Sequence, residues 1–427
     1  MLDIKEIMVE KLFPRHIINQ VKVWEGRKEA VVILGPRRAG KTCLLKLLVQ
    51  RYYNKGMEAF YFDAEDPEDR DILDQGPKAL KQFLGKGGMI FIDEFHLLED
   101  PSHFVKLCVD HYPEFKLYLT GSSSIAALKK FKNSLIGRTV EFELFPLNFK
   151  EFLVFRHQDR YRNLLEDFNF YKPHFPSIKR IPKRLISFLE EYLVFGRFPE
   201  VVLCKDTEMK AKLVSQIFRI YALRDLKLLF SARKETVFRK VFIALSGSIG
   251  SPVNISSIAS DIGVSSKTVS AYIELLKSLY LIKELTPFYK NPRSEIKKSP
   301  KIYFIDTGLL SWARGSFASL SDRSELAGLY AENAIYLGFL NRLRPEERVY
   351  YWKSKMGTEI DFILSRGREI IPVEVKYRER PKAKIPAGFL KRYGNYITHF
   401  IVATKNHLEI KQVYDFRQFF IPIHFLI

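Results

Sequence analysis

The chain has 427 residues, of which 47% are hydrophobic and 28% charged, so it is long enough for several domains with buried cores. No apolar run reaches the length of a membrane span, and the charged start MLDIKEIMVEKLF is unlike a signal peptide. Three widely spaced cysteines, Cys43, Cys108 and Cys204, exclude a disulfide framework and a cysteine-rich zinc site. We therefore expect a cytoplasmic protein that does not contact a membrane.

The net charge of +20 is unevenly distributed. Residues 1–158 carry a net charge of +2, whereas residues 159–290 and 291–427 carry +9 each. A basic surface favours polyanions, and nucleic acid first among them. A generally basic proteome would produce the same excess, so charge alone does not identify the partner.

The chain opens with a predicted amphipathic helix around Glu6–Val23, which we expect to pack on the first strand. That strand, Val31–Leu34, leads directly into GPRRAGKT, which has the G-x-x-x-x-G-K-[ST] spacing of a phosphate-binding loop. A stretch with helical periodicity follows the loop, as the motif requires.

The residue types of this loop suit a nucleotide phosphate chain. Glycines allow backbone N–H groups to converge on phosphate oxygens, and the N-terminus of the next helix adds a positive dipole end. We expect Lys41 to reach the β- and γ-phosphates of ATP, and the Thr42 hydroxyl to bind Mg²⁺. The predicted nucleotide-binding residues of this segment are Gly35, Pro36, Arg37, Arg38, Ala39, Gly40, Lys41, Thr42 and Cys43.

Two further apolar segments end in acidic residues. Ala59–Asp66 reads as a second strand, and GGMIFIDEFH gives a third strand that ends at Asp93-Glu94. About fifty residues after a phosphate-binding loop, this pair predicts that Asp93 holds Mg²⁺ and that Glu94 activates the attacking water as general base.

A fourth strand and an arginine complete the predicted site. Phe115–Ser124 is apolar and ends in small polar residues, so Thr120 or Ser122 could orient the water or touch the γ-phosphate; a plain turn with a serine N-cap is the alternative. Arg138 precedes a fifth strand and could stabilise phosphate charge in cis or from a neighbouring subunit, unless it is simply a solvated surface residue.

The segments GPRRAGKT, IFIDEFH, YLTGSSS and LIGR…FPLNFKEF resemble an AAA-type P-loop ATPase core. The resemblance is to archaeal and bacterial predicted ATPases with a winged-helix module and a restriction-endonuclease-like C-terminal domain. It extends to EEYLVFGRFPEVV, KSPKIYFIDTGLLSW and YYWKSKMGTEIDFIL, and so to nearly the whole chain. It implies binding and hydrolysis of ATP but no defined biological role, and Cys43 departs from it where Thr or Ser is more usual.

Residues 159–232 carry apolar positions at helical spacing and are predicted to form a helical lid over the nucleotide. Arg224-Asp225 at its far end could act as a second sensor pair, or could be an ordinary ion pair within a helix.

Residues 233–290 predict three helices and a β-ribbon, the pattern of a winged helix-turn-helix. Asn254 or Ser256 would cap the second helix, and Ser265 or Ser266 the third. If the third helix enters the major groove, its first residues would face DNA. These predicted DNA-binding residues are Ser265, Ser266, Lys267 and Thr268, followed by Ser270 and Tyr272. Protein or intramolecular contact is the alternative use of such a module.

The C-terminal residues 291–427 contain a second group of acids. GTEIDFIL and IIPVEVKYR form a predicted hairpin that sets Asp361 opposite Glu374, with Lys376 two residues further on the same face. A preceding helix presents Glu332. This set resembles the restriction-endonuclease-like nuclease core, in which carboxylates hold one or two Mg²⁺ ions and the lysine stabilises the hydroxide or phosphate. An ion-paired cluster in a domain that binds without cleaving is the alternative.

The predicted fold class is an α/β multidomain protein with an ATPase core at 1–158, a helical lid at 159–232, a winged helix-turn-helix at 233–290 and a nuclease-like α/β domain at 291–427. The favoured function is an Mg²⁺-dependent ATPase that acts on duplex or branched DNA. A regulatory ATPase switch with protein-binding C-terminal modules and an ATP-licensed DNA endonuclease are the alternatives. The sequence leaves open whether the chain forms an oligomer.

Overall fold

The computed structural model describes residues 4–121, 135–165, 168–174, 178, 180–220, 232–288, 299–321, 323–413 and 415–427. The chain folds into two compact units. The first contains Met1–Pro146 with Ser278–Tyr280, and the second contains Leu147–Lys277 with Leu281–Ile427. Among the described residues, no helix has both the length and the sustained apolar character that crossing a bilayer requires.

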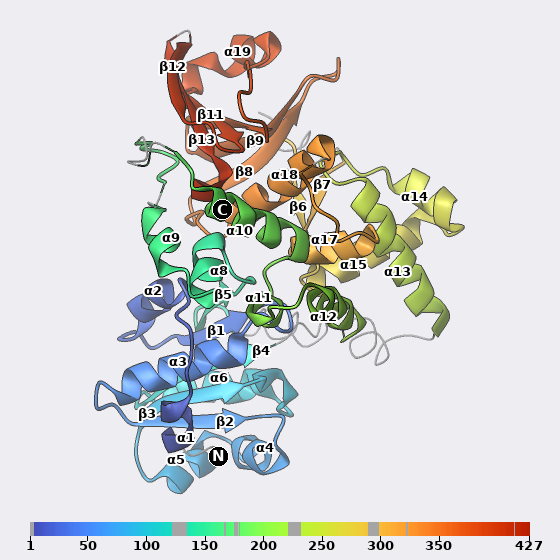
Figure 1. Cartoon of the computed structure of the whole chain (residues 1–427). Coiled ribbons are helices and arrows are strands. Elements are labelled where there is room, and N and C mark those ends of the chain that lie inside the picture. Colours follow the sequence, from blue (N-terminus) through green and yellow to red (C-terminus); the bar gives the residue numbers. More distant parts are fainter. Residues whose placement is uncertain are drawn as a thin grey trace. The chain divides into compact units, whose positions relative to one another are not determined.

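A five-stranded parallel sheet forms the centre of the first unit (Figure 1). Its strand order is β2-β3-β4-β1-β5, so the strand that leads into the phosphate-binding loop lies between β4 and β5. The strands are β1 (Ala30–Leu34), β2 (Ala59–Asp63), β3 (Gly88–Asp93), β4 (Phe115–Gly121) and β5 (Thr139–Glu143). The strands predicted from the apolar segments are thereby confirmed.

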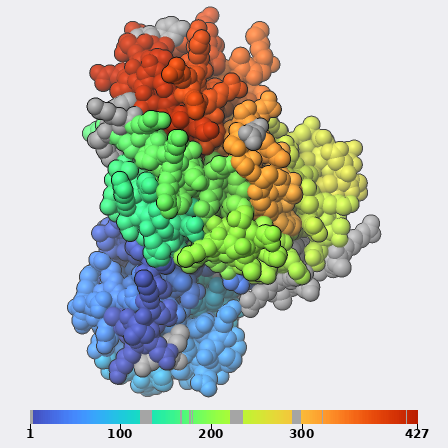
Figure 2. Space-filling model, in the orientation of Figure 1, coloured from blue at the N-terminus to red at the C-terminus, as the bar shows by residue number. Residues whose placement is uncertain are grey.

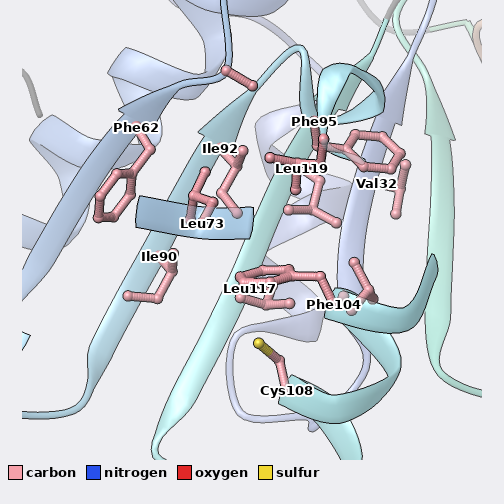
Figure 3. Packing of buried hydrophobic residues seen from close by; sticks show 14 of the residues in the cluster. Val32, Phe62, Leu73, Ile90, Ile92, Phe95, Phe104, Cys108, Leu117 and Leu119 are labelled. Atoms are coloured by element: carbon pink, nitrogen blue, oxygen red, sulfur yellow. The ribbon is translucent and has the colours of Figure 1, made fainter. Parts of the chain in front are cut away.

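Helices cover both faces of this sheet because its strands are apolar on both sides. The helices are α1 (Ile4–Val9), α2 (Ile18–Val21), α3 (Lys41–Tyr53), α4 (Pro67–Asp74), α5 (Pro77–Leu84) and α6 (Pro101–His111). Alternate residues of β1 serve different cores. Val32 packs with Ile92, Leu117 and Phe104 on one face (Figure 3), whereas Val31 and Ile33 pack with residues of α3 on the other.

The predicted helix over Glu6–Val23 is wrong as a single element. The structure has two short helices, α1 and α2, separated by an irregular segment around Pro14. Proline has no N–H to donate and clashes with the preceding turn, so a helix through this position would lose a hydrogen bond and bend. The irregular segment matters for the phosphate-binding loop, as described below.

The second unit begins with helices. They are α8 (Phe149–Phe155), α9 (Asp159–Leu164), α10 (Lys183–Phe195), α11 (Pro199–Leu203) and α12 (Thr207–Ile220). Asn148 and Glu151 start α8 with a reciprocal capping box, which explains why a helix begins there. The buried Arg197 guanidinium, between α10 and α11, donates to the Ile305 carbonyl, and the Arg197 N–H donates to Asp306 at 2.7 Å.

Three helices and a two-stranded ribbon follow, in yellow and orange in Figures 1 and 2. We call this set the helix–ribbon module: α13 (Ala232–Gly247), α14 (Ile255–Ile262), α15 (Ser266–Ser278), β6 (Ile282–Leu285) and β7 (Lys301–Phe304). Asn254 caps α14 and Ser265 caps α15, which resolves both alternatives. The strand of KSPKIYFIDTGLLSW, which the sequence suggested for the C-terminal domain, instead pairs with β6.

A six-stranded mixed sheet ends the chain, with strand order β12-β13-β11-β10-β9-β8. Its strands are β8 (Glu347–Lys353), β9 (Glu359–Arg366), β10 (Glu369–Lys376), β11 (His399–Thr404), β12 (Glu409–Val413) and β13 (Phe416–Pro422). The associated helices are α17 (Thr307–Ala313), α18 (Ser324–Leu340) and α19 (Ala387–Tyr393). The predicted hairpin of β9 and β10 is confirmed, with Arg366 paired to Glu369 across the turn at Gly367.

Substitutions at two glycines of α18 test how tightly this helix packs. A Cβ at Gly338 would overlap the backbone carbonyl of Leu426, whereas a Cβ at Gly328 would meet nothing within 4 Å. Gly338→Ala should therefore destabilise the chain by about 1–3 kcal/mol, because backbone cannot move aside as a side chain can. Gly328→Ala should stabilise it by up to about 1 kcal/mol through helix propensity. Chemical denaturation of both variants measures the difference, and equal effects would contradict the packing described.

Candidate functional site

The phosphate-binding loop connects β1 to α3 in a conformation that favours glycine at two positions. Gly40 has φ 93°, in the left-handed region that favours glycine. A Cβ at Gly35 would run into the Leu144 carbonyl, so this position also requires glycine. Lys41 is buried, and its ammonium donates to the carbonyls of Gly35 and Pro36 at 3.3 and 3.2 Å. The lysine thus folds back along the loop that it would serve.

Arg15 supports this loop and was missed by sequence reasoning. Its guanidinium is buried and donates to the Ala39 carbonyl of the loop at 2.8 Å and to the Phe145 carbonyl at 2.7 Å. It therefore ties the loop to the chain that leaves β5. The loop contact of Arg15 was not predicted because the segment was expected to be a continuous helix. The signal available was the position of Arg15 directly after Pro14, where a helix is unfavourable.

Asp93, Glu94 and Thr120 are brought together where β3 and β4 end. The Asp93 carboxylate is 3% exposed and accepts hydrogen bonds from the Thr120 and Tyr61 hydroxyls and the Glu94 N–H. Burial raises the pKa of Tyr61, so its phenol stays protonated and can donate. All three donors are neutral, so they orient the carboxylate without cancelling its charge. A carboxylate held in this way suits a Mg²⁺ ion.

Glu94 occupies a strained position. Its φ is 48°, in the left-handed region that a glutamate seldom adopts. The Glu94 N–H donates to Thr120 Oγ1 at 3.2 Å, and Glu94 Oε2 lies 3.2 Å from His96 Nδ1.

The other predicted nucleotide-binding residues differ in how far their side chains are exposed to solvent. Thr42 and Cys43 are exposed at the start of α3, and Arg38 is exposed in the loop. Ala39 is buried. Arg37 lies between these extremes. Ser122 and Arg224-Asp225 lie outside the described residues.

A role of Arg138 in cis is contradicted by its place in the sheet. It precedes β5, and its carbonyl accepts from the N–H of Ala30, which starts β1. The loop follows the other end of β1, five residues or about 17 Å along the strand. The Arg138 side chain instead pairs with Asp110 at 2.9 Å. A contribution to a neighbouring subunit's nucleotide stays a prediction.

The predicted DNA-facing residues of α15 are mostly accessible. Ser265, Ser266 and Lys267 are exposed, whereas Thr268 is half-buried and its hydroxyl bonds that of Ser265 at 2.8 Å. Tyr272 is a correction: it is 7% exposed and its ring stacks edge-on with Phe238, so it belongs to the core of the helix–ribbon module. Tyr272 comes four residues after Thr268. Four residues make slightly more than one helical turn, so Tyr272 lies on a neighbouring face of α15, which is buried.

The second group of acids also comes together. The β9–β10 register pairs Phe362 with Val373, and one step further sets Asp361 beside Glu374. The Val375 N–H donates to Asp361 Oδ2 at 2.7 Å. Glu332 from α18 and Lys376 act electrostatically on the same carboxylates. The side chains therefore share one site, as the hairpin argument predicts.

Lys301 is the buried member of this cluster that the sequence did not reveal, and Lys353 and Glu359 are two further members. Lys301 starts β7, its side chain is 0% exposed, and its ammonium lies 3.3 Å from Glu332 Oε1 and pairs with Glu359. Its signal was a lysine at the head of an otherwise apolar strand. We call Lys301, Lys353, Lys376, Glu332, Glu359, Asp361 and Glu374 the carboxylate–lysine cluster.

The cluster does not fit the Mg²⁺ ions that a nuclease core would carry. Each carboxylate already accepts a hydrogen bond or an ion pair from the protein. In the part of the chain that the structure describes, no three His, Cys, Asp or Glu side chains are arranged to hold a metal ion. The nucleotide site needs fewer protein ligands, because phosphate oxygens and water complete the Mg²⁺ shell there.

Burial sets the protonation of the cluster. It raises the pKa of Glu332 to about 7 against the attraction of Lys301, and it raises the pKa of Glu374 to about 7 with help from the repulsion of Asp361. Burial also raises the pKa of Asp361. Burial lowers the pKa of Lys301, but its carboxylate neighbours outweigh this effect and raise it overall, so its ammonium stays charged.

Comparison with known proteins identifies the first part of the chain. Residues 27–153 match the model of an AAA domain. Residues 186–320 and 327–426 match two models described as domains of unknown function, DUF8612 and DUF4143. The chain therefore carries an AAA-type P-loop ATPase domain, a helical region and a C-terminal mixed sheet.

Curated relatives match over most of the chain. An uncharacterised protein of Methanocaldococcus jannaschii is 28% identical over 362 residues, which cover 83% of this chain and 76% of that protein. An uncharacterised protein of Haemophilus influenzae is 26% identical over 365 residues, covering 81% and 82%. These relatives show that the arrangement of segments recurs, and they assign no activity.

Two solved structures are similar at low scores. DnaA from Aquifex aeolicus bound to AMPPCP has 13% identity and a TM-score of 0.31, covering 65% of this chain and 92% of that one. Cdc6p from Pyrobaculum aerophilum has 13% identity and a TM-score of 0.31, covering 78% and 99%.

The raised pKa of Glu374 gives a test of the cluster. Its folded-state pKa of about 7 exceeds the ordinary 4.5, so ionised Glu374 costs stability, and this cost develops as pH rises from about 4.5 to 7. Glu374→Gln should therefore raise the free energy of unfolding by roughly 1–3 kcal/mol at pH 8, and the gain should become small at pH 5.

Glu369→Gln is the matched control for this measurement. Glu369 lies on the same strand, but it is exposed and pairs with Arg366 at 2.6 Å. Its substitution should give no gain in stability at pH 8. Denaturant titrations at both pH values measure the effect, and a loss of stability in Glu374→Gln at pH 8 would show that its ionised form is favourable.

Proposed function

We propose that this chain is an Mg²⁺-dependent ATPase that couples ATP hydrolysis to action on DNA. The observation that carries the proposal is the junction of β1, β3 and β4, where the loop Gly35–Thr42 lies at the same sheet edge as Asp93-Glu94 and Thr120. The match of residues 27–153 to an AAA domain supports nucleotide binding.

Each residue of this site has a distinct role in the proposal. The loop amides and Lys41 hold the phosphates, which are stabilised by the dipole of α3. Thr42 and Asp93 hold Mg²⁺, which neutralises the developing charge. Glu94 accepts a proton from the attacking water, and Thr120 fixes the turn that presents Glu94 through its bond to the Glu94 N–H.

Action on DNA is supported by the charge and by the helix–ribbon module. Residues 159–427 carry a net charge of +18, whereas the ATPase part is nearly neutral. The exposed start of α15 presents Lys267 between Ser266 and Thr268. A lysine beside small hydroxyl side chains suits contact with DNA phosphates and base edges. A cytoplasmic location fits this role.

Lys41→Ala and Glu94→Gln test the nucleotide site. Lys41→Ala should lower ATP affinity and abolish turnover, because the phosphates lose their cation. Glu94→Gln should keep ATP binding and lose hydrolysis by about 10²–10⁴-fold, because the water loses its base while Asp93 still holds Mg²⁺. Nucleotide binding by calorimetry and turnover by phosphate release separate the two. Wild-type turnover in Glu94→Gln would show that the base lies elsewhere.

Lys267→Glu tests the DNA surface. Duplex DNA should bind at low salt, and affinity should fall steeply as salt rises because phosphate contacts release counterions. Lys267→Glu should weaken binding more than Lys240→Glu, which makes the same charge change at an exposed position on α13. Fluorescence anisotropy over a salt series measures both. If no binding is detected at about 50 mM salt, the regulatory switch becomes the better hypothesis.

A further inference from the structure

We propose that the ammonium of Lys301 occupies the cation position of the carboxylate–lysine cluster in place of a metal ion. The C-terminal domain therefore does not use a metal ion at this cluster to cleave DNA. This inference concerns a different part of the molecule from the nucleotide site and does not depend on the proposed function. It replaces the metal-bound nuclease site that the sequence resemblance implies.

The ammonium of Lys301 lies between carboxylates, in the kind of position that a bound metal ion would take. Its side chain is completely buried between carboxylates of two different elements, Glu332 on α18 and Glu359 on β9. Its ammonium also lies 5.3 Å from the ring centroid of Tyr351, whose electron-rich face attracts a cation. Asp361 is the third carboxylate that acts on it. The buried ammonium of Lys301 thus lies among three of the four acids, Glu332, Glu359 and Asp361.

Protein donors hold both oxygens of Glu359 and one oxygen each of Glu332, Asp361 and Glu374. Glu332 Oε1 also accepts the Tyr303 hydroxyl at 2.5 Å, and Glu359 Oε2 pairs with Lys353 at 2.9 Å. Glu374 Oε2 pairs with Lys376 at 2.8 Å. A Mg²⁺ ion needs several oxygens in near-ideal octahedral geometry. Among the described residues, no three of these acids are arranged to supply them.

The cluster balances its own charge. Its four carboxylates, Glu332, Glu359, Asp361 and Glu374, face three ammonium groups, so one proton is enough to make the set neutral. The raised pKa values of Glu332 and Glu374 supply a place for that proton near neutral pH. A divalent ion would meet the buried ammonium of Lys301 between Glu332 and Glu359, and Coulomb repulsion from it opposes entry.

The origin of Lys301 explains why the hairpin motif is misleading. The acid-x-Lys pattern lies on β9 and β10, but the cation comes from β7, which is paired with β6 in the ribbon of the helix–ribbon module. Asp361 and Glu374 therefore do not need a metal to stay together. Through Lys301, the ribbon is joined to Glu332 on α18 and to Glu359 on β9.

The first test uses the full chain without nucleotide and measures melting temperature with and without Mn²⁺. The proposal predicts that Mn²⁺ shifts wild type and Asp361→Asn equally, because any metal effect then arises outside the cluster. A shift in wild type that Asp361→Asn removes would overturn the proposal. So would Mn²⁺-dependent cleavage of duplex DNA by wild type that Asp361→Asn abolishes.

The second test compares Lys301→Met with Lys353→Met. Both lysines pair with Glu359, but Lys353 is 38% exposed. At pH 8, Lys301→Met should lower the melting temperature much more than Lys353→Met, and the difference should shrink at pH 6, where Glu332 takes up a proton. Equal effects of the two substitutions would contradict the assignment. If Lys301→Met does not fold, the comparison of wild type with Asp361→Asn still decides.

Discussion

A parallel sheet places the carboxyl ends of its strands at one edge, and the nucleotide site depends on this constraint. Because β4 lies between β1 and β3, the turns after these three strands are neighbours. The phosphate-binding loop follows β1, Asp93 ends β3 with Glu94 directly after it, and Thr120 is the second-last residue of β4. The same constraint removes Arg138 from the site, since it lies where a strand begins.

The two acidic sites of the chain show how the donors around a carboxylate determine what it can bind. Asp93 is buried and accepts hydrogen bonds from the neutral hydroxyls of Tyr61 and Thr120, a set of donors that suits an incoming cation. The acids around Lys301 are buried among ammonium groups, so their charge is already compensated. Breaking a buried ion pair by removing one partner typically costs about 3–5 kcal/mol, whereas replacing the whole group by apolar residues can cost little. Removing Lys301 alone is therefore expected to destabilise the fold, because it would leave Glu332 and Glu359 buried without their cation.

Much of the architecture could be predicted from the sequence because its signals are local. Apolar runs that end in glycine or acids predicted β1 to β4 of the first sheet, and the spacing about Gly367 predicted the register of β9 and β10. The failures involve residues whose role depends on distant partners. Arg15 contacts carbonyls 24 and 130 residues away, and Lys301 meets Glu332 from another element. Tyr272 has the spacing of a groove-facing residue, but its burial depends on Phe238 of α13.

The central claim is that ATP hydrolysis at the first sheet is coupled to DNA. It is tested most directly by steady-state ATP turnover of the intact chain with Mg²⁺ at low salt, titrated with duplex and with branched DNA. The account predicts that one of these DNAs raises turnover, and that the increase disappears at high salt. Turnover that is measurable but unchanged by either DNA at low salt would contradict the coupling.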